Sequence, residues 1–181
     1  MFELKVNDDI TLRMLSARDS EALFRITDES RGYLKRWLPW LDSIRTSHDS
    51  LEFIKNTFHS YNNRTGITSG IFLHGELVGI IGYNYLDFRN KIGSIGYWLS
   101  ENQQGKGIMT VSIRALIHYG FENLKLNRIE IRIAEQNIQS QKVVNRIGFY
   151  YEGHIRDAEW LYDHYVDHFV YSMLKKEWIH S

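Results

Sequence analysis

A short segment with two glycines is the part of this 181-residue sequence best suited to binding an anion. Residues 102–110 read Asn-Gln-Gln-Gly-Lys-Gly-Ile-Met-Thr. Gly105 and Gly107 allow the backbone to turn sharply and to approach a ligand closely. If a helix begins after them, its first N–H groups lack intrahelical partners and, together with the helix dipole, attract a phosphate. The segment therefore predicts either a pyrophosphate site or, as for any isolated Gly-x-Gly, a tight connection alone.

The elements around this segment are a strand, a helix and a second strand. Residues 92–99 form a strand-like apolar run, and residues 108–123 have the spacing of apolar residues that is typical of a helix packed on a sheet. Residues 129–133 alternate between apolar and polar, the period of a strand with one buried face. This order predicts a parallel crossover. Residues 137–147 then predict a short helix, capped by Asn137 and ended by Gly148.

The rest of the chain predicts strands and helices on either side of this crossover. The strands before it are expected to form an antiparallel meander. We therefore expect an α+β fold, or α/β in looser usage, with a mostly antiparallel sheet, one parallel pair and flanking helices. The remaining expected elements are strands at 2–6, 10–14, 71–73 and 77–85, helices around 22–26 and 50–61, a turn at 74–76, and final strands at 149–152 and 160–171.

Composition limits the possible classes of protein. With 43% apolar and 24% charged residues, the chain is expected to form a single domain over residues 1–181. The absence of cysteine excludes disulfides, thiolate metal ligands and a cysteine acyl-enzyme. The 22 basic and 22 acidic residues balance, so no overall field attracts nucleic acid or an anionic membrane. No apolar run is long enough to span a bilayer and the start does not resemble a signal peptide, so we expect a cytoplasmic protein.

Several motifs in a fixed order resemble the GNAT superfamily of N-acetyltransferases and, within it, the bacterial RimJ/RimL group that acetylates the N-termini of ribosomal proteins. The resemblance covers nearly the whole chain and implies acetyl-CoA as cosubstrate. It also implies direct transfer of acetyl to a primary amine, with the α-amino group of a ribosomal protein as the expected acceptor. Aminoglycosides, polyamines and other small amines are alternative acceptors, and a non-catalytic acyl-CoA-binding regulatory module is an alternative function. The matching segments are residues 10–19, 97–100, 102–110, 137–140, 145–149 and 151–154.

The same resemblance implies where the cosubstrate binds. The strands at 92–99 and 129–134 are expected to splay apart, with the pantetheine arm between them and near the backbone of Leu99. Asn137 either contacts this arm or only caps its helix. Asn102 stands where the superfamily has Gln or Arg, a mild departure because backbone N–H groups provide most of the phosphate contacts. Lys106 either adds a charge or is an ordinary solvated lysine. The implied phosphate-binding residues are Gln104, Gly105, Lys106, Gly107, Ile108, Met109 and Thr110.

Acetyl transfer needs a base for the amine, a donor for the thioester oxygen and a proton for the leaving thiolate. Because an α-amino group has a pKa of about 8, a carboxylate base would help near neutral pH. The resemblance assigns this role to Glu159, with Glu130 and Glu135 as alternatives. It assigns proton donation to Ser140, which can equally be a residue of the first helical turn. A backbone N–H near Leu99 would meet the oxyanion, and no step requires a metal.

The acceptor side is expected at a basic, aromatic segment near the N-terminus. This segment either receives an acidic protein N-terminus or serves packing, with Lys and Arg stems covering Trp rings. His164 and His168 lie four residues apart in an expected strand and no His-Glu-x-x-His is present, so we expect no zinc site there. Aromatic residues at 160–171 are compatible with a homo-oligomer. The acceptor segment contains Arg31, Tyr33, Lys35, Arg36, Trp37, Trp40 and Arg45.

Overall fold

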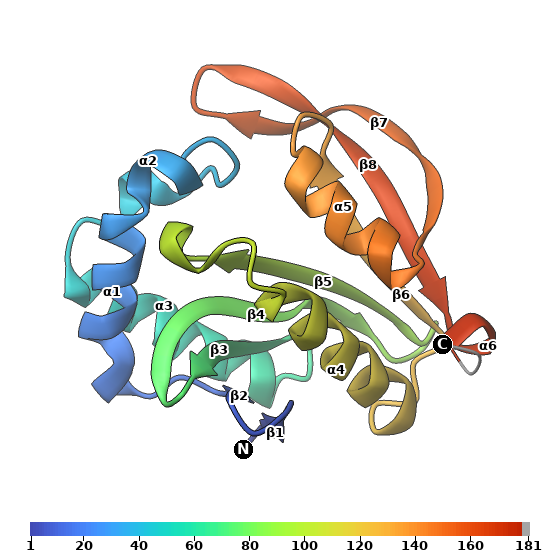
Figure 1. Cartoon of the computed structure of the whole chain (residues 1–181), viewed down its shortest axis with the longest axis horizontal. Coiled ribbons are helices and arrows are strands. Elements are labelled where there is room, and N and C mark those ends of the chain that lie inside the picture. The colour runs from blue at the N-terminus through green and yellow to red at the C-terminus, as the bar shows by residue number, and fades with distance from the viewer. Residues whose placement is uncertain (179–181) are drawn as a thin grey trace.

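The computed structural model describes residues 1–178 as an eight-stranded sheet with helices on both faces (Figure 1). The strand order is β1-β2-β3-β4-β5-β6-β8-β7. All neighbours are antiparallel except β5 and β6, which are parallel. This confirms the expected α+β fold. The strands are β1 Glu3–Lys5, β2 Ile10–Arg13, β3 Ile67–Leu73, β4 Glu76–Asp87, β5 Ile92–Leu99, β6 Arg128–Ala134, β7 Tyr150–Leu161 and β8 His164–Leu174.

The helices cover the two faces of the sheet in pairs. Helices α1 and α3 lie on one face, and α4 and α5 lie on the other (Figure 1). Within residues 1–178, no helix combines the length and the apolar character needed to cross a membrane. The helices are α1 Ser20–Glu29, α2 Arg31–Leu34, α3 Ser47–Asn62, α4 Ile108–Glu122, α5 Ile138–Ile147 and α6 Lys175–Trp178, with short 3-10 turns at Ala17–Asp19, Leu41–Ser43 and Glu101–Gln103.

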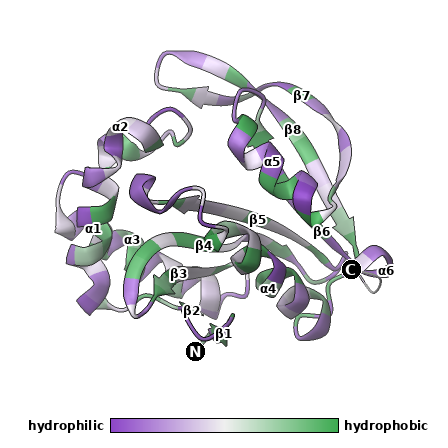
Figure 2. Ribbon diagram, in the orientation of Figure 1, coloured by the Kyte–Doolittle hydropathy of each residue, from purple (hydrophilic) through white to green (hydrophobic). Residues whose placement is uncertain are grey.

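Strand β4 is buried on both sides and joins two hydrophobic clusters. Ile80 packs with Leu23 and Ile54 in the cluster under α1 and α3. The next residue, Ile81, packs with Leu116 in the larger cluster under α4. The outer strand β7 is different, because it is mostly exposed and mainly hydrophilic (Figure 2). The core therefore lies around β4, with one edge of the sheet extending into solvent.

The C-terminal hairpin differs from the sequence prediction. The expected strand at 160–171 is confirmed from His164 onward, where β8 begins, but its start is wrong, because Trp160 and Leu161 belong to β7 and the chain reverses at Tyr162, which has φ of 61°. The expected strand at 149–152 is too short, because β7 continues to Leu161. Register shifts in β7 between Tyr151 and Gly153 and between Ile155 and Glu159 break the alternation that would have marked one long strand.

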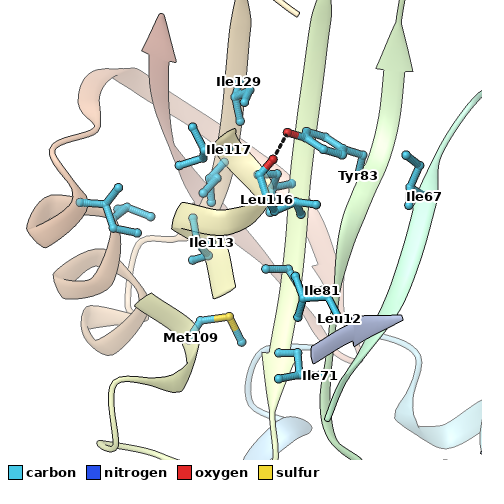
Figure 3. Close-up of a cluster of buried hydrophobic side chains, with 14 of the residues drawn as sticks. Leu12, Ile67, Ile71, Ile81, Tyr83, Met109, Ile113, Leu116, Ile117 and Ile129 are labelled. Carbon is cyan, nitrogen blue, oxygen red and sulfur yellow. Dashed lines mark hydrogen bonds between the residues drawn. The ribbon is translucent and has the colours of Figure 1, made fainter. Parts of the chain in front are cut away.

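Tyr83 fixes α4 against the sheet. Its side chain is fully buried, and its hydroxyl donates a hydrogen bond of 2.9 Å to the Leu116 carbonyl of α4 (Figure 3). Gly93 and Gly120 lie against the same side chain, and a Cβ at Gly120 would lie 2.0 Å from the Tyr83 oxygen. The two glycines therefore leave the space that Tyr83 fills between β5 and α4.

We predict that Gly120→Ala and Tyr83→Phe will be coupled in their effect on stability. Gly120→Ala should lower the free energy of unfolding by about 1–3 kcal/mol through overpacking against the hydroxyl. Tyr83→Phe should cost about 1 kcal/mol by removing the bond to Leu116. Denaturant unfolding of the double variant should show a loss clearly smaller than the sum of the single losses, because the obstructing oxygen is gone. Strictly additive losses would contradict this contact.

Candidate active site

The parallel strands β5 and β6 pair at one end only. Their register consists of Ile92 with Arg128, Gly93 with Ile129, and Ser94 with Glu130. Beyond these pairs β5 continues beside β4, while β6 continues beside β8 as far as Ala134. The splay implied by the family resemblance is therefore present in the pairing. Backbone groups on the facing edges of residues 95–98 and 131–133 are left for a ligand that can complete the ladder.

The glycine segment opens toward free space at the start of α4. Gly105 and Gly107 have φ of 75° and 77°, in the left-handed region that favours glycine. No atom lies within 4 Å of the position where a Cβ would stand on either residue. Both glycines thus adopt the sharp turn that the sequence predicted, and the space above them can hold a ligand.

The first turn of α4 has backbone donors without acceptors. Gly107 is the N-cap and supplies no side-chain bond, and the Val111 N–H is the first to bond within the turn, to the Gly107 carbonyl at 3.2 Å. Among residues 1–178 no acceptor meets the N–H groups of Ile108, Met109 or Thr110. The Gln104 side chain holds the preceding turn by donating to the Leu99 carbonyl at 2.9 Å. The turn can therefore bind phosphate through its backbone.

Cations stand near this turn. Lys106 is exposed, and its ammonium donates to the Gln103 side chain at 2.8 Å. Arg146 reaches from the last turn of α5 and donates to the Thr110 hydroxyl at 3.4 Å. The sequence analysis missed Arg146, because only the packing of α5 beside α4 brings it there. Two cations thus lie close to the free donors of α4, although the whole chain has no net charge.

Helix α5 begins next to the open end of β6. The Asn137 side chain caps the helix by accepting the Ser140 N–H at 3.2 Å, as the capping interpretation predicted. A contact between Asn137 and pantetheine remains a prediction. The Ser140 hydroxyl is not used by this cap, and the residue is half-buried. Ser140 can therefore interact with a ligand lying in the wedge between β5 and β6.

Glu159 lies beside a histidine that the sequence analysis had weighed only as a metal ligand. The Glu159 Oε2 is 3.5 Å from His168 Nε2, and their side chains are 31% and 16% exposed. His168 pairs with Ala134, the last residue of β6. Glu159 thus stands near the carboxyl end of β6, the same end of the wedge at which α5 begins. Among residues 1–178, no hydrogen bond joins Glu159 to Ser140.

The two alternative bases have other contacts. Glu130 accepts from Arg128 at 2.7 Å and 3.2 Å, where β5 and β6 are still paired. Arg128 also donates to Glu152 at 2.6 Å and lowers the pKa of that carboxyl. Glu135 directly follows β6 and is half-buried. Glu130 is therefore committed to an ion pair at the closed end of the wedge, whereas Glu135 stays near its open end.

A cluster of hydrogen bonds holds the irregular part of β7. Asp167 accepts from the Asp157 N–H at 2.8 Å and bonds His154 Nε2 at 2.7 Å. These two bonds lower the pKa of the Asp167 carboxyl, with the Asp157 N–H as the main cause. Ligand atoms of Glu135, His154 and Asp167 all lie within 4.8 Å of one another. Because both Asp167 oxygens already have partners, the cluster serves first to fix the bulge that precedes Glu159.

The hairpin tip is tied to the N-terminal aromatic segment. The Tyr162 hydroxyl donates to the Leu38 carbonyl at 2.5 Å and accepts from the Leu41 N–H at 3.1 Å. Tyr33 donates to the Gln139 side chain of α5 at 3.1 Å. These bonds connect elements more than a hundred residues apart in sequence. They link the β7–β8 turn and α5, on one side of the site, to the N-terminal aromatic segment on the other.

Much of the charge of that segment is used internally. Lys35 pairs with Asp42 at 2.7 Å and also lies over the Tyr162 ring. Arg31 donates to the Leu41 and Ile44 carbonyls at 2.6 Å and 2.7 Å. These contacts support the packing interpretation for both cations. Arg36 remains exposed, over the rings of Tyr33 and Trp37.

An apolar pocket lies beside this segment. The Trp40 and Trp98 rings are 6.1 Å apart at one of its walls. Its volume is about 320 Å³, a size suited to one amino-acid side chain or a small group. Because Trp98 directly precedes Leu99, the pocket opens next to the end of β5. The pocket is lined by Leu23, Thr27, Trp40, Ser43, Ile44, Ser50, Phe53 and Trp98.

Comparisons with known proteins agree with this geometry. Residues 9–150 match the family model described as "Acetyltransferase (GNAT) domain". The chain is 37% identical over 179 residues to YdaF of Bacillus subtilis (strain 168), named "Putative ribosomal N-acetyltransferase", with 98% of each chain covered. A solved structure of the microcin C7 self-immunity acetyltransferase MccE with acetyl-CoA and AMP superposes with a TM-score of 0.90, 31% identity and 94% of each chain covered. RimL, a ribosomal L7/L12 alpha-N-protein acetyltransferase, was solved with coenzyme A and gives a TM-score of 0.91 at 26% identity, covering 97% of this chain and 99% of that one.

Proposed function

This chain belongs to the GNAT acetyltransferase family and is an N-acetyltransferase related to those of ribosomal proteins, and from this premise we propose that it transfers acetyl from acetyl-CoA directly to the α-amino group of a protein. The observation that carries the proposal is the loss of pairing between β5 and β6 after Ser94, next to the open glycine turn. We further propose that residues 1–181 act as one acetyltransferase domain in the cytoplasm.

The donor site follows from the unpaired backbone. The free N–H groups at the start of α4 would hold the diphosphate of acetyl-CoA, with Lys106 and Arg146 adding positive charge. The amides of the pantetheine arm would bond the open edges of β5 and β6. This places the thioester near Leu99, whose backbone N–H would stabilise the developing oxyanion. RimL and MccE bind coenzyme A and acetyl-CoA, respectively, in their solved structures.

The proton transfers of the reaction would use side chains at the open end of the wedge. Glu159 would accept a proton from the attacking amine, directly or through water, with His168 beside its carboxylate. The Ser140 hydroxyl would hydrogen-bond the sulfur and return a proton to it. Because the chain has no cysteine, an acyl-enzyme on cysteine cannot form. In the proposed reaction the amine attacks acetyl-CoA directly within a ternary complex.

The acceptor would enter from the side of the N-terminal aromatic segment. Trp98 and Trp40 line an apolar pocket there, and the Tyr162 bonds hold the hairpin tip over the same region. An extended protein N-terminus can place a side chain in the pocket while its amine reaches Leu99 and Glu159. Exposed Arg36 supplies positive charge for acidic residues farther along such a chain.

An assay of free thiol release tests the acceptor class. We expect turnover with acetyl-CoA and peptides carrying the N-termini of ribosomal proteins, and much slower turnover with the same peptides blocked at the α-amine. Aminoglycosides, polyamines and nucleotide-linked amines serve as competing acceptors in the same array. Preference for one of these would replace the protein acceptor, and coenzyme A binding without turnover on any amine would indicate a regulatory module instead.

Gly107→Trp is predicted to abolish acetyl-CoA binding, because the indole would fill the open space above the turn. The matched control is Gly75→Trp, since Gly75 also has positive φ and free space but lies in the β3–β4 turn. Both substitutions carry a similar backbone penalty of about 1 kcal/mol. Calorimetry should detect binding with the control and none with Gly107→Trp. Equal affinity in the two variants would place the phosphate site elsewhere.

Glu159→Gln is predicted to lower kcat by about 100-fold or more near neutral pH, while the Kd for acetyl-CoA stays nearly constant. The defect should shrink as the pH rises above about 8, where the amine loses its proton without help. Glu135→Gln is the matched control at the same strand end. An undiminished rate with Glu159→Gln, or the larger loss with Glu135→Gln, would remove Glu159 from the role of base.

A further inference from the structure

Tyr97 of β5 has a buried hydroxyl without a partner. Its ring packs against the larger hydrophobic cluster, and among residues 1–178 no group forms a hydrogen bond with its buried oxygen. Tyr83, on the neighbouring strand, is also buried but bonds the Leu116 carbonyl. Leaving a buried hydroxyl unpaired costs about 1–3 kcal/mol, and such groups are uncommon in folded proteins. Within residues 1–178, Tyr97 and Ser112 have buried side-chain oxygens without a partner, and Tyr97 is the one that stands on a strand bordering the wedge. Its oxygen therefore indicates a partner that the chain itself does not supply.

The position of Tyr97 points to the leaving group of the transfer reaction. It lies in the part of β5 beyond Ser94, where pairing with β6 has ended, and two residues before Leu99. The Ser140 hydroxyl is close enough to lower the pKa of Tyr97, but the two oxygens do not meet the geometry of a hydrogen bond. Two hydroxyl groups thus approach the same part of the wedge, one from β5 and one from α5.

Tyr97 keeps its proton under ordinary conditions. Burial raises its pKa to about 12, more than the nearby Ser140 hydroxyl lowers it. Tyr171 of β8 also raises the pKa of Tyr97. It therefore adds to the effect of burial and favours the protonated form of Tyr97. At neutral pH the group is therefore an O–H donor that lacks an acceptor.

We infer that Tyr97 is a catalytic residue that donates a hydrogen bond to the sulfur of the thioester as it leaves. This inference rests on the proposed acetyl-CoA-dependent function. When the amine nitrogen bonds the carbonyl carbon, the C–S bond breaks and its electron pair passes to sulfur. Tyr97 stabilises that charge and retains its own proton, because a thiol is the stronger acid. The amine loses one proton to Glu159, the thiolate takes one from the Ser140 hydroxyl, and Ser140 regains one from water as Glu159 returns its proton to water, so the step balances.

Tyr97→Phe removes only the oxygen and tests the inference. We expect kcat to fall about 10- to 100-fold, with the Kd for acetyl-CoA changed less than about threefold, since the hydrogen bond is strongest after charge develops on sulfur. The unfolding midpoint should stay equal or rise, because an unpaired buried group is lost. Tyr83→Phe is the matched control for stability: it removes a paired hydroxyl from the core and should lower the unfolding midpoint, the opposite of the change expected for Tyr97→Phe.

A second measurement separates this inference from the proposed function. The thiol of bound coenzyme A should titrate at lower pH in the unmodified protein than in Tyr97→Phe, as followed by the ultraviolet absorbance of the thiolate. If coenzyme A binds and turnover proceeds but neither kcat nor the thiol titration changes in Tyr97→Phe, the role of Tyr97 is wrong while the function stands. If coenzyme A does not bind the unmodified protein, the proposed function itself fails.

Discussion

The feature on which the site depends is the point where β5 and β6 stop pairing. Three residue pairs hold the strands together at one end, and each strand then continues with a different neighbour. A sheet interrupted in this way exposes two rows of backbone donors and acceptors inside the protein, which is unfavourable unless something fills them. A ligand with amides of its own can do so. The fold therefore builds a binding site from main chain, before any side chain contributes.

Rigidity around this wedge comes from residues away from the reacting atoms. Tyr83 locks α4 to the sheet through Leu116, and this fixes where the free N–H groups of α4 point. On the other side, β6 remains fully paired with β8, whose His168 stands next to Glu159. The two strands thus diverge because each is held by its own neighbour. The positions of α4 and of Glu159 are therefore set by packing away from the proposed reaction centre.

The sequence predicted the parts of the site that depend on local patterns. Gly105 and Gly107, the following helix and the cap at Asn137 depend on neighbouring residues, and the structure contains all of them. The hairpin carrying Glu159 was mispredicted, because bulges in β7 break the alternation by which a strand is recognised.

Contacts between segments that are distant in sequence could not be predicted from local sequence patterns. Arg146 meets Thr110 only through the packing of α5 on α4. Tyr97 and Ser140 approach each other across the wedge, and nothing in the sequence around either residue marks that meeting. A buried hydroxyl can be recognised as unpaired only in the folded structure, because its possible partners come from distant segments of the chain.

In the proposed function, donor recognition and acceptor recognition use different parts of the chain. The donor would meet mostly main chain, which tolerates a change such as Asn102 in place of the usual Gln or Arg. The acceptor side is made of side chains, with Trp40 and Trp98 in a pocket and Tyr162 joining the hairpin to the segment at Leu38. Substitutions there can alter the amine that is chosen while the backbone wedge stays the same. RimL and MccE both superpose closely on this chain yet carry names that refer to different biological roles, so the shared fold does not by itself identify the acceptor.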